Sequence, residues 1–145
     1  MTSKVIIYTD GSAAPNPGPG GYAAVLMYDG VEKEVYGSNR QTTNNQMELT
    51  AAVSALDALK RPCEVELHTD SAYMRNGITK WIHNWLKNGW KTAKGKPVEN
   101  QDLWMRLYDL TQRHDITWKW VKGHSTNQMN ERVDKLAKKA RKEKL

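Results

Sequence analysis

Two apolar segments of this chain end in the same way, and this repetition constrains the fold more than any other feature. The first leads into Thr9-Asp10-Gly11 and the second into Thr69-Asp70-Ser71. β-branched and alternating apolar residues precede each Thr-Asp pair, as expected of strands, and a small turn residue follows. Parallel neighbouring strands end at one edge of a sheet, where open α/β sheets place their sites. We therefore expect both aspartates to project from that edge.

Hydrophobic spacing predicts the other elements. Asp29-Gly30 suits a two-residue hairpin turn, and the Pro/Gly-rich stretch 14–21 is expected to be a loop. The predicted strands are 5–10, 22–28, 31–36, 64–70 and 116–120, and the predicted helices are 43–59, 71–77, 80–87, 101–113 and 130–144. A hairpin followed by helix-linked strands indicates an α/β fold. We expect one mixed five-stranded sheet flanked by helices, with strands 1–3 antiparallel and strands 1, 4 and 5 parallel.

Length and composition predict one globular domain over residues 1–145, with 39% hydrophobic and 26% charged residues. The single cysteine, Cys63, excludes an intramolecular disulfide and a thiolate zinc site, and we interpret it as an unreactive packing residue. The longest apolar stretch, 23–28, is too short to cross a membrane, and the N-terminus lacks the features of a secretory signal. These observations predict a cytoplasmic protein that does not contact membranes.

The charge distribution indicates an anionic partner. The net charge is +6 and the pI is near 9.4, but overall charge is a weak signal. The stretch 71–98 is more specific, because it contains no Asp or Glu and six Lys or Arg residues. Clustered basic residues displace counterions from a phosphate backbone. We expect this local patch to bind nucleic acid.

Four carboxylates are candidates for a metal site. Besides Asp10 and Asp70, Glu48 lies in the first turns of the helix that leads into the fourth strand, and Asp134 follows Val133 on the last helix. Mg²⁺ is held by a few carboxylates while phosphate and water fill its other positions, and two such ions can cleave a phosphodiester. Taken singly, each acid fits a turn or a solvated helix face equally well. The spacing alone supports only the hypothesis of a metal-dependent phosphotransfer site.

Several ordered motifs resemble one known family, type-1 ribonuclease H, and within it the bacterial ribonuclease HI group. Among them are Tyr8-Thr9-Asp10-Gly11-Ser12 and Trp120-Val121-Lys122-Gly123-His124. The matching segments are 8–12, 16–22, 42–49, 69–71, 77–85, 88–92, 120–124 and 130–134. They run through nearly the whole chain in order, which makes chance agreement improbable.

The resemblance implies an endonuclease that hydrolyses the RNA strand of RNA/DNA hybrids by two-metal-ion catalysis and leaves 5′-phosphate and 3′-hydroxyl ends. It implies two Mg²⁺ ions, with Mn²⁺ as an alternative ion, and a monomer. The metal ligands it assigns are Asp10, Glu48, Asp70 and Asp134. His124 corresponds to the histidine that assists proton transfer or product release, although a solvent-exposed loop histidine is the alternative.

The resemblance also implies a substrate groove, because an enzyme that cuts only RNA must sense the 2′-hydroxyl. Thr43 and Asn100 correspond to a pocket for a DNA phosphate, and residues 80–99 to a basic handle that grips the DNA strand. The residues implied to bind nucleic acid are Gly11, Asn16, Thr43, Asn44, Asn45, Ser71, Tyr73, Trp81, Asn84, Lys87 and Asn100. Turn and cap chemistry would explain the Asn and Gly residues equally well. Of the tryptophans, we expect 85, 104, 118 and 120 to be structural.

Two other functions are compatible with the residues. The same fold serves nucleases that cut DNA, which share the carboxylates but not the combination of handle and Asn-rich groove. A non-catalytic hybrid-binding module, whose acids are incidental, is the other alternative.

Two positions depart from the family's pattern. Gln41 stands where many members carry an arginine beside the phosphate pocket, and Ala72 replaces a glutamine that often contacts RNA. Because each removes one contact, we predict weaker hybrid binding, with the chemistry intact, than in a member that has both residues. Equilibrium binding at matched salt tests this, and equal or tighter binding would contradict it.

Overall fold

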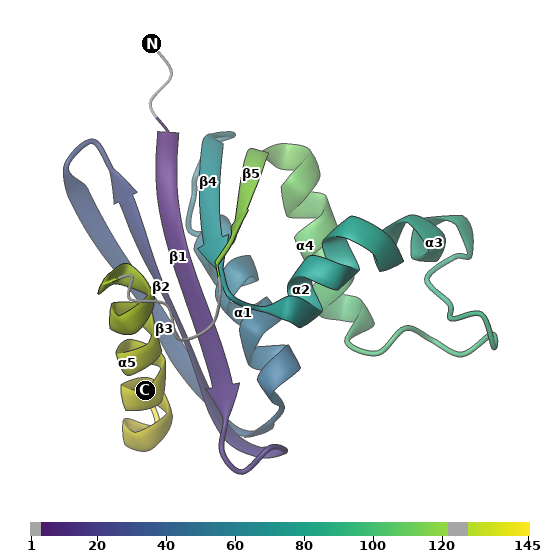
Figure 1. The fold of residues 1–145 in the computed structure, drawn as a ribbon, viewed down its shortest axis with the longest axis horizontal. Helices are drawn as coiled ribbons and strands as arrows, with labels where there is room; N and C mark the ends of the chain where they lie inside the picture. The colour runs from purple at the N-terminus through teal and green to yellow at the C-terminus, as the bar shows by residue number, and fades with distance from the viewer. Residues whose placement is uncertain (1–3, 122–127) are drawn as a thin grey trace.

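A computed structural model describes residues 4–121 and 128–145. One five-stranded sheet, in the order β3-β2-β1-β4-β5, has α1 and α4 packed on one face and α5 on the other (Figure 1). The elements are β1 (Lys4–Ala13), β2 (Gly18–Tyr28), β3 (Val31–Thr42), α1 (Asn44–Asp57), β4 (Glu64–Thr69), α2 (Ala72–Asn76), η1 (Gly77–Trp81), α3 (Ile82–Lys87), α4 (Gln101–Arg113), β5 (Asp115–Trp120) and α5 (Gln128–Glu143). No described helix is long and apolar enough to cross a membrane.

The sheet has the predicted topology. β1 pairs antiparallel with β2 and parallel with β4, and β4 pairs parallel with β5. Tyr8 on β1 lies opposite His68 on β4, so Asp10 and Asp70 each follow this pair by two residues on adjacent strands. The register therefore places both aspartates at one rim of the sheet.

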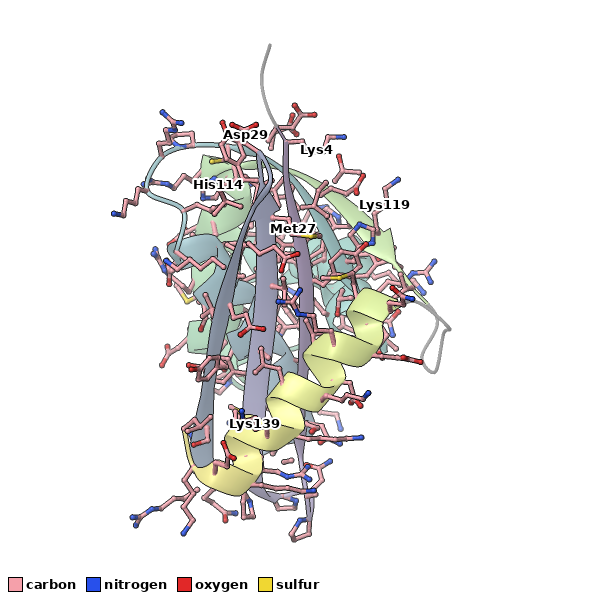
Figure 2. The ribbon with its side chains drawn as sticks, turned by 90° about the vertical axis from the view of Figure 1, so that its left-hand side faces the viewer. Lys4, Met27, Asp29, His114, Lys119 and Lys139 are labelled. Carbon is pink, nitrogen blue, oxygen red and sulfur yellow. The ribbon has the colours of Figure 1, made fainter. Side chains whose placement is uncertain are left out.

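Two separate apolar layers hold the helices. The main core lies between the sheet and α1 and α4, and its largest fully buried side chain is Trp104. α5 covers the opposite face, where it crosses β1, β2 and β3 diagonally (Figure 2). Val133, Ala137 and Ala140 are the buried residues of α5, and they follow a helical spacing. The rest of that helix surface remains available to solvent.

The structure corrects four predicted boundaries. β1 does not end at Gly11-Ser12 but continues, paired with β2, to Ala13. The stretch 14–21 is not all loop, because β2 begins at Gly18, and Pro19 is accommodated where the β2–β3 register shifts. β3 continues to Thr42 rather than ending at residue 36. The helix that begins at Ala72 does not stop at Gly77 but passes through the wide turn η1 into α3. Gly77 serves a close approach rather than a helix end, since any Cβ there would collide with the Trp104 ring.

His114 joins the end of α4 to the start of β4. Its Nδ1 accepts a hydrogen bond of 3.1 Å from the Cys63 amide, and the Cys63 carbonyl accepts one of 3.0 Å from the Asp115 amide. His114 is buried, and this burial, followed by the charge of Arg113, lowers the pKa of its imidazole below the usual 6.5. The folded protein therefore favours the neutral ring.

We predict that this histidine makes the fold sensitive to acid. Its stabilising effect is complete above about pH 6.5 and decreases as the pH falls below that value, because the unfolded chain then binds the proton more readily than the folded one. His114→Asn keeps an acceptor for the Cys63 amide and should flatten this part of the profile. Urea unfolding at several pH values measures the effect, with His83→Asn, an exposed histidine on α3, as the control. An unchanged slope in His114→Asn would contradict the assignment.

Candidate active site

Asp70 directly follows the carboxyl end of β4, and Asp10 lies at the same level on the neighbouring parallel strand β1, three residues before that strand ends. Asp10 is partly buried, Asp70 is exposed, and Oδ1 of Asp10 accepts a hydrogen bond of 2.9 Å from the Gly11 amide. Burial, followed by the Asp70 charge and the Asp134 side chain, together raise the pKa of Asp10 to about 8. Three acidic side chains from β1, the end of β4 and α5 therefore influence one another at this rim.

Asp134 reaches the rim from α5. Arg132, two residues earlier, donates to Glu32 at 2.7 Å and to Glu34 at 3.1 Å, which ties the first turns of α5 to β3. On the next turn, the ammonium of Lys138 lies 3.0 Å from Oδ2 of Asp134. The buried residues Val133, Ala137 and Ala140 hold α5 on the sheet, and the Arg132 ion pairs add a link to β3. This placement brings the Asp134 carboxylate to Asp10.

Glu48 is oriented by Ser71. The Ser71 hydroxyl donates to Oε2 of Glu48. Oγ of Ser71 also accepts a hydrogen bond of 3.0 Å from the Met74 amide and so caps α2. Burial raises the pKa of Glu48, the Ser71 hydrogen bond opposes this, and the nearby Asp70 charge adds to it. Ser71 thereby connects the carboxylate on α1 with the segment that leaves β4.

Gly11 allows α1 to approach β1. A Cβ at this position would lie inside the backbone of Met47 and 2.8 Å from the Glu48 amide nitrogen. Real Cβ atoms do not come so close, so a larger residue would force strand and helix apart. The absence of a side chain at Gly11 therefore helps to bring Glu48 to the rim where Asp10 lies.

The donor set fits a hard divalent cation. All four groups are carboxylates, and two of them are partly buried with raised pKa values, so their negative charge lacks full compensation by solvent. Across residues 4–121 and 128–145, no three His, Cys, Asp or Glu side chains form a ready-made cation cage. The acids instead interact as pairs, Asp10 with Asp70, Asp10 with Asp134, and Glu48 with Asp70.

Asparagine side chains connect the loop after β1 with the start of α1. The Ala13 amide donates to Oδ1 of Asn44 at 2.6 Å, and the Asn44 amide donates to Oδ1 of Asn16 at 3.1 Å. Thr43 caps α1 by accepting from the Gln46 amide at 3.1 Å. These residues have the cap and turn contacts that the sequence offered as an alternative, and Asn44 contacts β1 two residues after Gly11. Asn45, in the first turn of α1, is partly exposed.

An open hollow separates the N-terminal ends of α1 and α4. It is lined by Gln46, Asn100, Gln101, Asp102 and Leu103. Asn100 donates to the Tyr73 hydroxyl at 3.1 Å, and this hydroxyl also accepts the Trp104 indole N–H at 2.9 Å. Of the two residues predicted for a phosphate pocket, Asn100 lines this hollow and Thr43 does not. Gln46 lines it but was not predicted, although the Thr43-x-x-Gln46 pattern of a capping box was a usable signal.

The other predicted contact residues lie on the segment that projects from the sheet beyond α2 (Figure 1). Trp81, Asn84 and Lys87 are exposed there, and the Trp81 ring packs edge-on against Tyr73 with centroids 5.7 Å apart. Trp85 is partly buried and packs against the core, as predicted for a structural tryptophan. His124 lies outside the described residues.

We predict that Gly11→Ala lowers stability and displaces Glu48. The added methyl group cannot fit beside the Met47 backbone, and overpacking of this kind costs roughly 1–3 kcal/mol. Urea unfolding measures the loss, and the chemical shift of the Glu48 amide reports the displacement.

Gly30→Ala is the matched control, because space around Gly30 is open and only its positive φ of 78° opposes a side chain. Its cost should stay near 1 kcal/mol, the penalty for left-handed backbone, with no shift at Glu48. A stable Gly11→Ala variant with an unmoved Glu48 would show that the close approach does not position the site.

Comparison with known proteins shows to which family this chain is similar. The sequence profile of the RNase H family, described as "RNase H", matches residues 2–142. A Ribonuclease H of Granulibacter bethesdensis is 60% identical over 139 residues, covering 96% of this chain and 93% of that protein. A Ribonuclease H of Francisella tularensis subsp. novicida is 56% identical, covering 95% and 91%.

Solved structures agree with the sequence comparison. The crystal structure of LC9-RNase H1, described as a type 1 RNase H with the type 2 active-site motif, superposes with a TM-score of 0.88 at 31% identity, covering all of this chain and 75% of that one. LC11-RNase H1, solved in complex with an RNA/DNA hybrid, has the same fold at 24% identity and a TM-score of 0.69, covering 96% and 97%. The chain therefore belongs to the RNase H family, the enzymes that cut the RNA strand of RNA/DNA hybrids.

Proposed function

We propose that this chain hydrolyses the RNA strand of RNA/DNA hybrids with two divalent cations, Mg²⁺ in the first place, held by Asp10, Glu48, Asp70 and Asp134. The observation that carries the proposal is the meeting of carboxylates from β1, the end of β4, α5 and α1 at one rim. Two cations held there would activate a water and stabilise the departing 3′ oxygen, and such a reaction leaves 5′-phosphate and 3′-hydroxyl ends.

The chain's own residues give the carboxylates different tasks. Asp10 interacts with Asp70 and Asp134, and Asp70 interacts with Asp10 and Glu48, so these two aspartates link the other two carboxylates. Ser71 holds the Glu48 carboxylate by its hydroxyl, which limits the rotation of that side chain. The buried residues of α5, together with the Arg132 ion pairs to β3, keep Asp134 at the rim. No serine or cysteine nucleophile is needed in such a reaction.

We place the hybrid across this rim. Gly11, Asn16, Asn44, Asn45 and Ser71 surround the carboxylates with short polar groups suited to the sugar edges, where a 2′-hydroxyl distinguishes RNA from DNA. Asn100 lines the hollow and Thr43 caps α1, whose Gln46 lines it too, and both Thr43 and Asn100 are assigned to a DNA phosphate. The hollow lies beside the N-terminus of α4, and this position supports the assignment to a phosphate, because unpaired helix amides attract anions.

The projecting segment supplies the second contact with the DNA strand. Residues 80–99 carry five exposed lysines and the exposed ring of Trp81, and both groups suit a nucleic-acid backbone and its bases. Tyr73, Trp81, Asn84 and Lys87 are the contacts we assign there. His124 remains our candidate for proton transfer or product release. The expectations of a cytoplasmic monomer and of Mn²⁺ as an alternative ion also stay predictions.

We predict that Asp10→Asn and Asp70→Asn each reduce cleavage of a labelled hybrid by at least about a thousandfold, roughly 4 kcal/mol. Each change removes a metal-binding charge and keeps the shape of the side chain. Hybrid binding without divalent ions should be unchanged or tighter, because a negative charge next to the backbone has been lost. Single-turnover kinetics and equilibrium binding give the two values.

Asp29→Asn is the matched control. Asp29 lies in the β2–β3 turn, next to the start of β1 and at the opposite end of that strand from Asp10 (Figure 2). The Asp29→Asn variant loses the same charge, and its cleavage rate should stay within about twofold of the wild-type rate, because surface substitutions away from the site have small effects. Turnover at the wild-type rate in either rim variant would refute the ligand assignment.

Three substrates separate the proposed reaction from the alternatives. Labelled hybrid, duplex DNA and duplex RNA are each incubated with and without Mg²⁺. Cleavage confined to the RNA of the hybrid supports the proposal. Cleavage of duplex DNA would identify a DNA nuclease of the same fold, and binding without any cleavage would identify a non-catalytic module.

A further inference from the structure

The outward face of α5 carries a concentration of positive charge outside the predicted handle. From residue 128 to the end of the chain there are seven Lys or Arg residues against three Asp or Glu residues. Four of these basic residues are exposed lysines: Lys135, Lys138, Lys139 and Lys142. The last three follow the first by three, four and seven residues, which places all four on one side of the helix. This set of four lysines is called the α5 lysine row below.

The α5 lysine row begins at the proposed active site. Its second member, Lys138, pairs with Asp134, one of the four rim carboxylates. Along the helix, Lys135 to Lys142 spans roughly 10 Å, at about 1.5 Å per residue. Successive phosphates of one strand advance about 3.4 Å along a duplex. A strand lying along α5 would therefore meet about three phosphates.

The placement of α5 complements the handle. α5 and α3 lie at opposite ends of the longest dimension of the protein, and the carboxyl end of β4 lies between them (Figure 1). Residues 80–99 carry the basic charge on one side of the carboxylates, and the α5 lysine row carries it on the other. In the view of Figure 2, no described element covers the outer side of α5, on which Lys139 is labelled.

The buried side of α5 determines which anionic partner fits. Val133, Ala137 and Ala140 pack against the sheet, so α5 has no free apolar face to insert between lipid chains. Of the three lysines besides Lys138, none has an ion pair among the described residues. A polyphosphate backbone needs only such exposed charges, whereas interfacial binding to a membrane needs apolar contact as well.

We propose that the α5 lysine row is a second nucleic-acid contact, which binds backbone phosphates of the hybrid on the side of the cleavage site opposite the handle. The proposal rests on the proposed function for the identity of the duplex. It extends that function by assigning part of the affinity for the hybrid to α5, which otherwise contributes only Asp134.

The test compares two triple variants that lose the same charge. Lys135→Gln/Lys139→Gln/Lys142→Gln removes three members of the row and leaves Lys138, which pairs with Asp134. The control, Lys33→Gln/Lys60→Gln/Arg61→Gln, removes three exposed charges from β3 and the α1–β4 connection. Binding of a long labelled hybrid is measured in EDTA over a range of salt concentrations, so that no cleavage occurs.

The α5 variant should bind the hybrid at least about tenfold more weakly at about 100 mM salt. The slope of log K against log salt should also become shallower by about two to three, because each lost phosphate contact reduces the slope by about 0.9. The control should change binding by less than about twofold. Equal losses in both variants, or no loss in the α5 variant, would overturn the proposal. Circular dichroism checks that each variant is folded.

A second measurement uses the wild-type protein and does not depend on the folding of a variant. Lysine acetylation is followed by mass spectrometry with and without the hybrid, and with anionic lipid vesicles as a third condition. The hybrid should protect Lys135, Lys139 and Lys142 but not Lys33 and Lys60. Protection by vesicles alone would overturn the proposal in favour of a membrane surface.

These results are separable from those on the reaction. A wild-type protein that binds hybrid through α5 but never cleaves it with Mg²⁺ would refute the proposed function and leave the contact standing. A protein that cleaves hybrid normally and shows no protection of α5 would refute the contact alone.

Discussion

The burial and mutual repulsion of carboxylates gathered at one rim of the sheet are the constraint on which the rest of this structure depends. Burial in the first place, and then the neighbouring Asp70 and Asp134, raise the pKa of Asp10 to about 8, so its charged form is unfavourable there. Such a group persists only where the surrounding structure is stable enough to hold it. The elements around the rim can be understood as the parts that hold these acids together against their mutual repulsion.

Each restraint acts from a different part of the chain. The β1–β4 pairing sets the level of Asp10 and Asp70, and Gly11 lets α1 come close to β1. Ser71 holds Glu48, and Arg132 ties α5 to β3 through two glutamates. Since these contacts come from different segments, losing one weakens the position of one carboxylate and leaves the others in place.

The sequence was sufficient to predict the topology of the sheet and the convergence of Asp10 with Asp70, because both follow from strand pattern and the direction of parallel strands. It failed where the decisive contact is not local. Gly77 resembles a helix end by propensity, but its role is to make room for Trp104, a residue from a distant helix. Pro19 resembles a loop residue, but a register shift admits it into β2. The ion pairs of Arg132 likewise join residues far apart in the sequence, with no periodicity that would reveal them.

Trp104 illustrates what such distant contacts do. Its ring lies against Gly77, where the projecting segment begins, and its indole N–H donates to the Tyr73 hydroxyl, which also binds Asn100 at the edge of the hollow. The start of the projecting segment and the edge of the hollow are therefore both connected to the same buried ring. A displacement of this one ring would therefore move the start of the projecting segment and the edge of the hollow together.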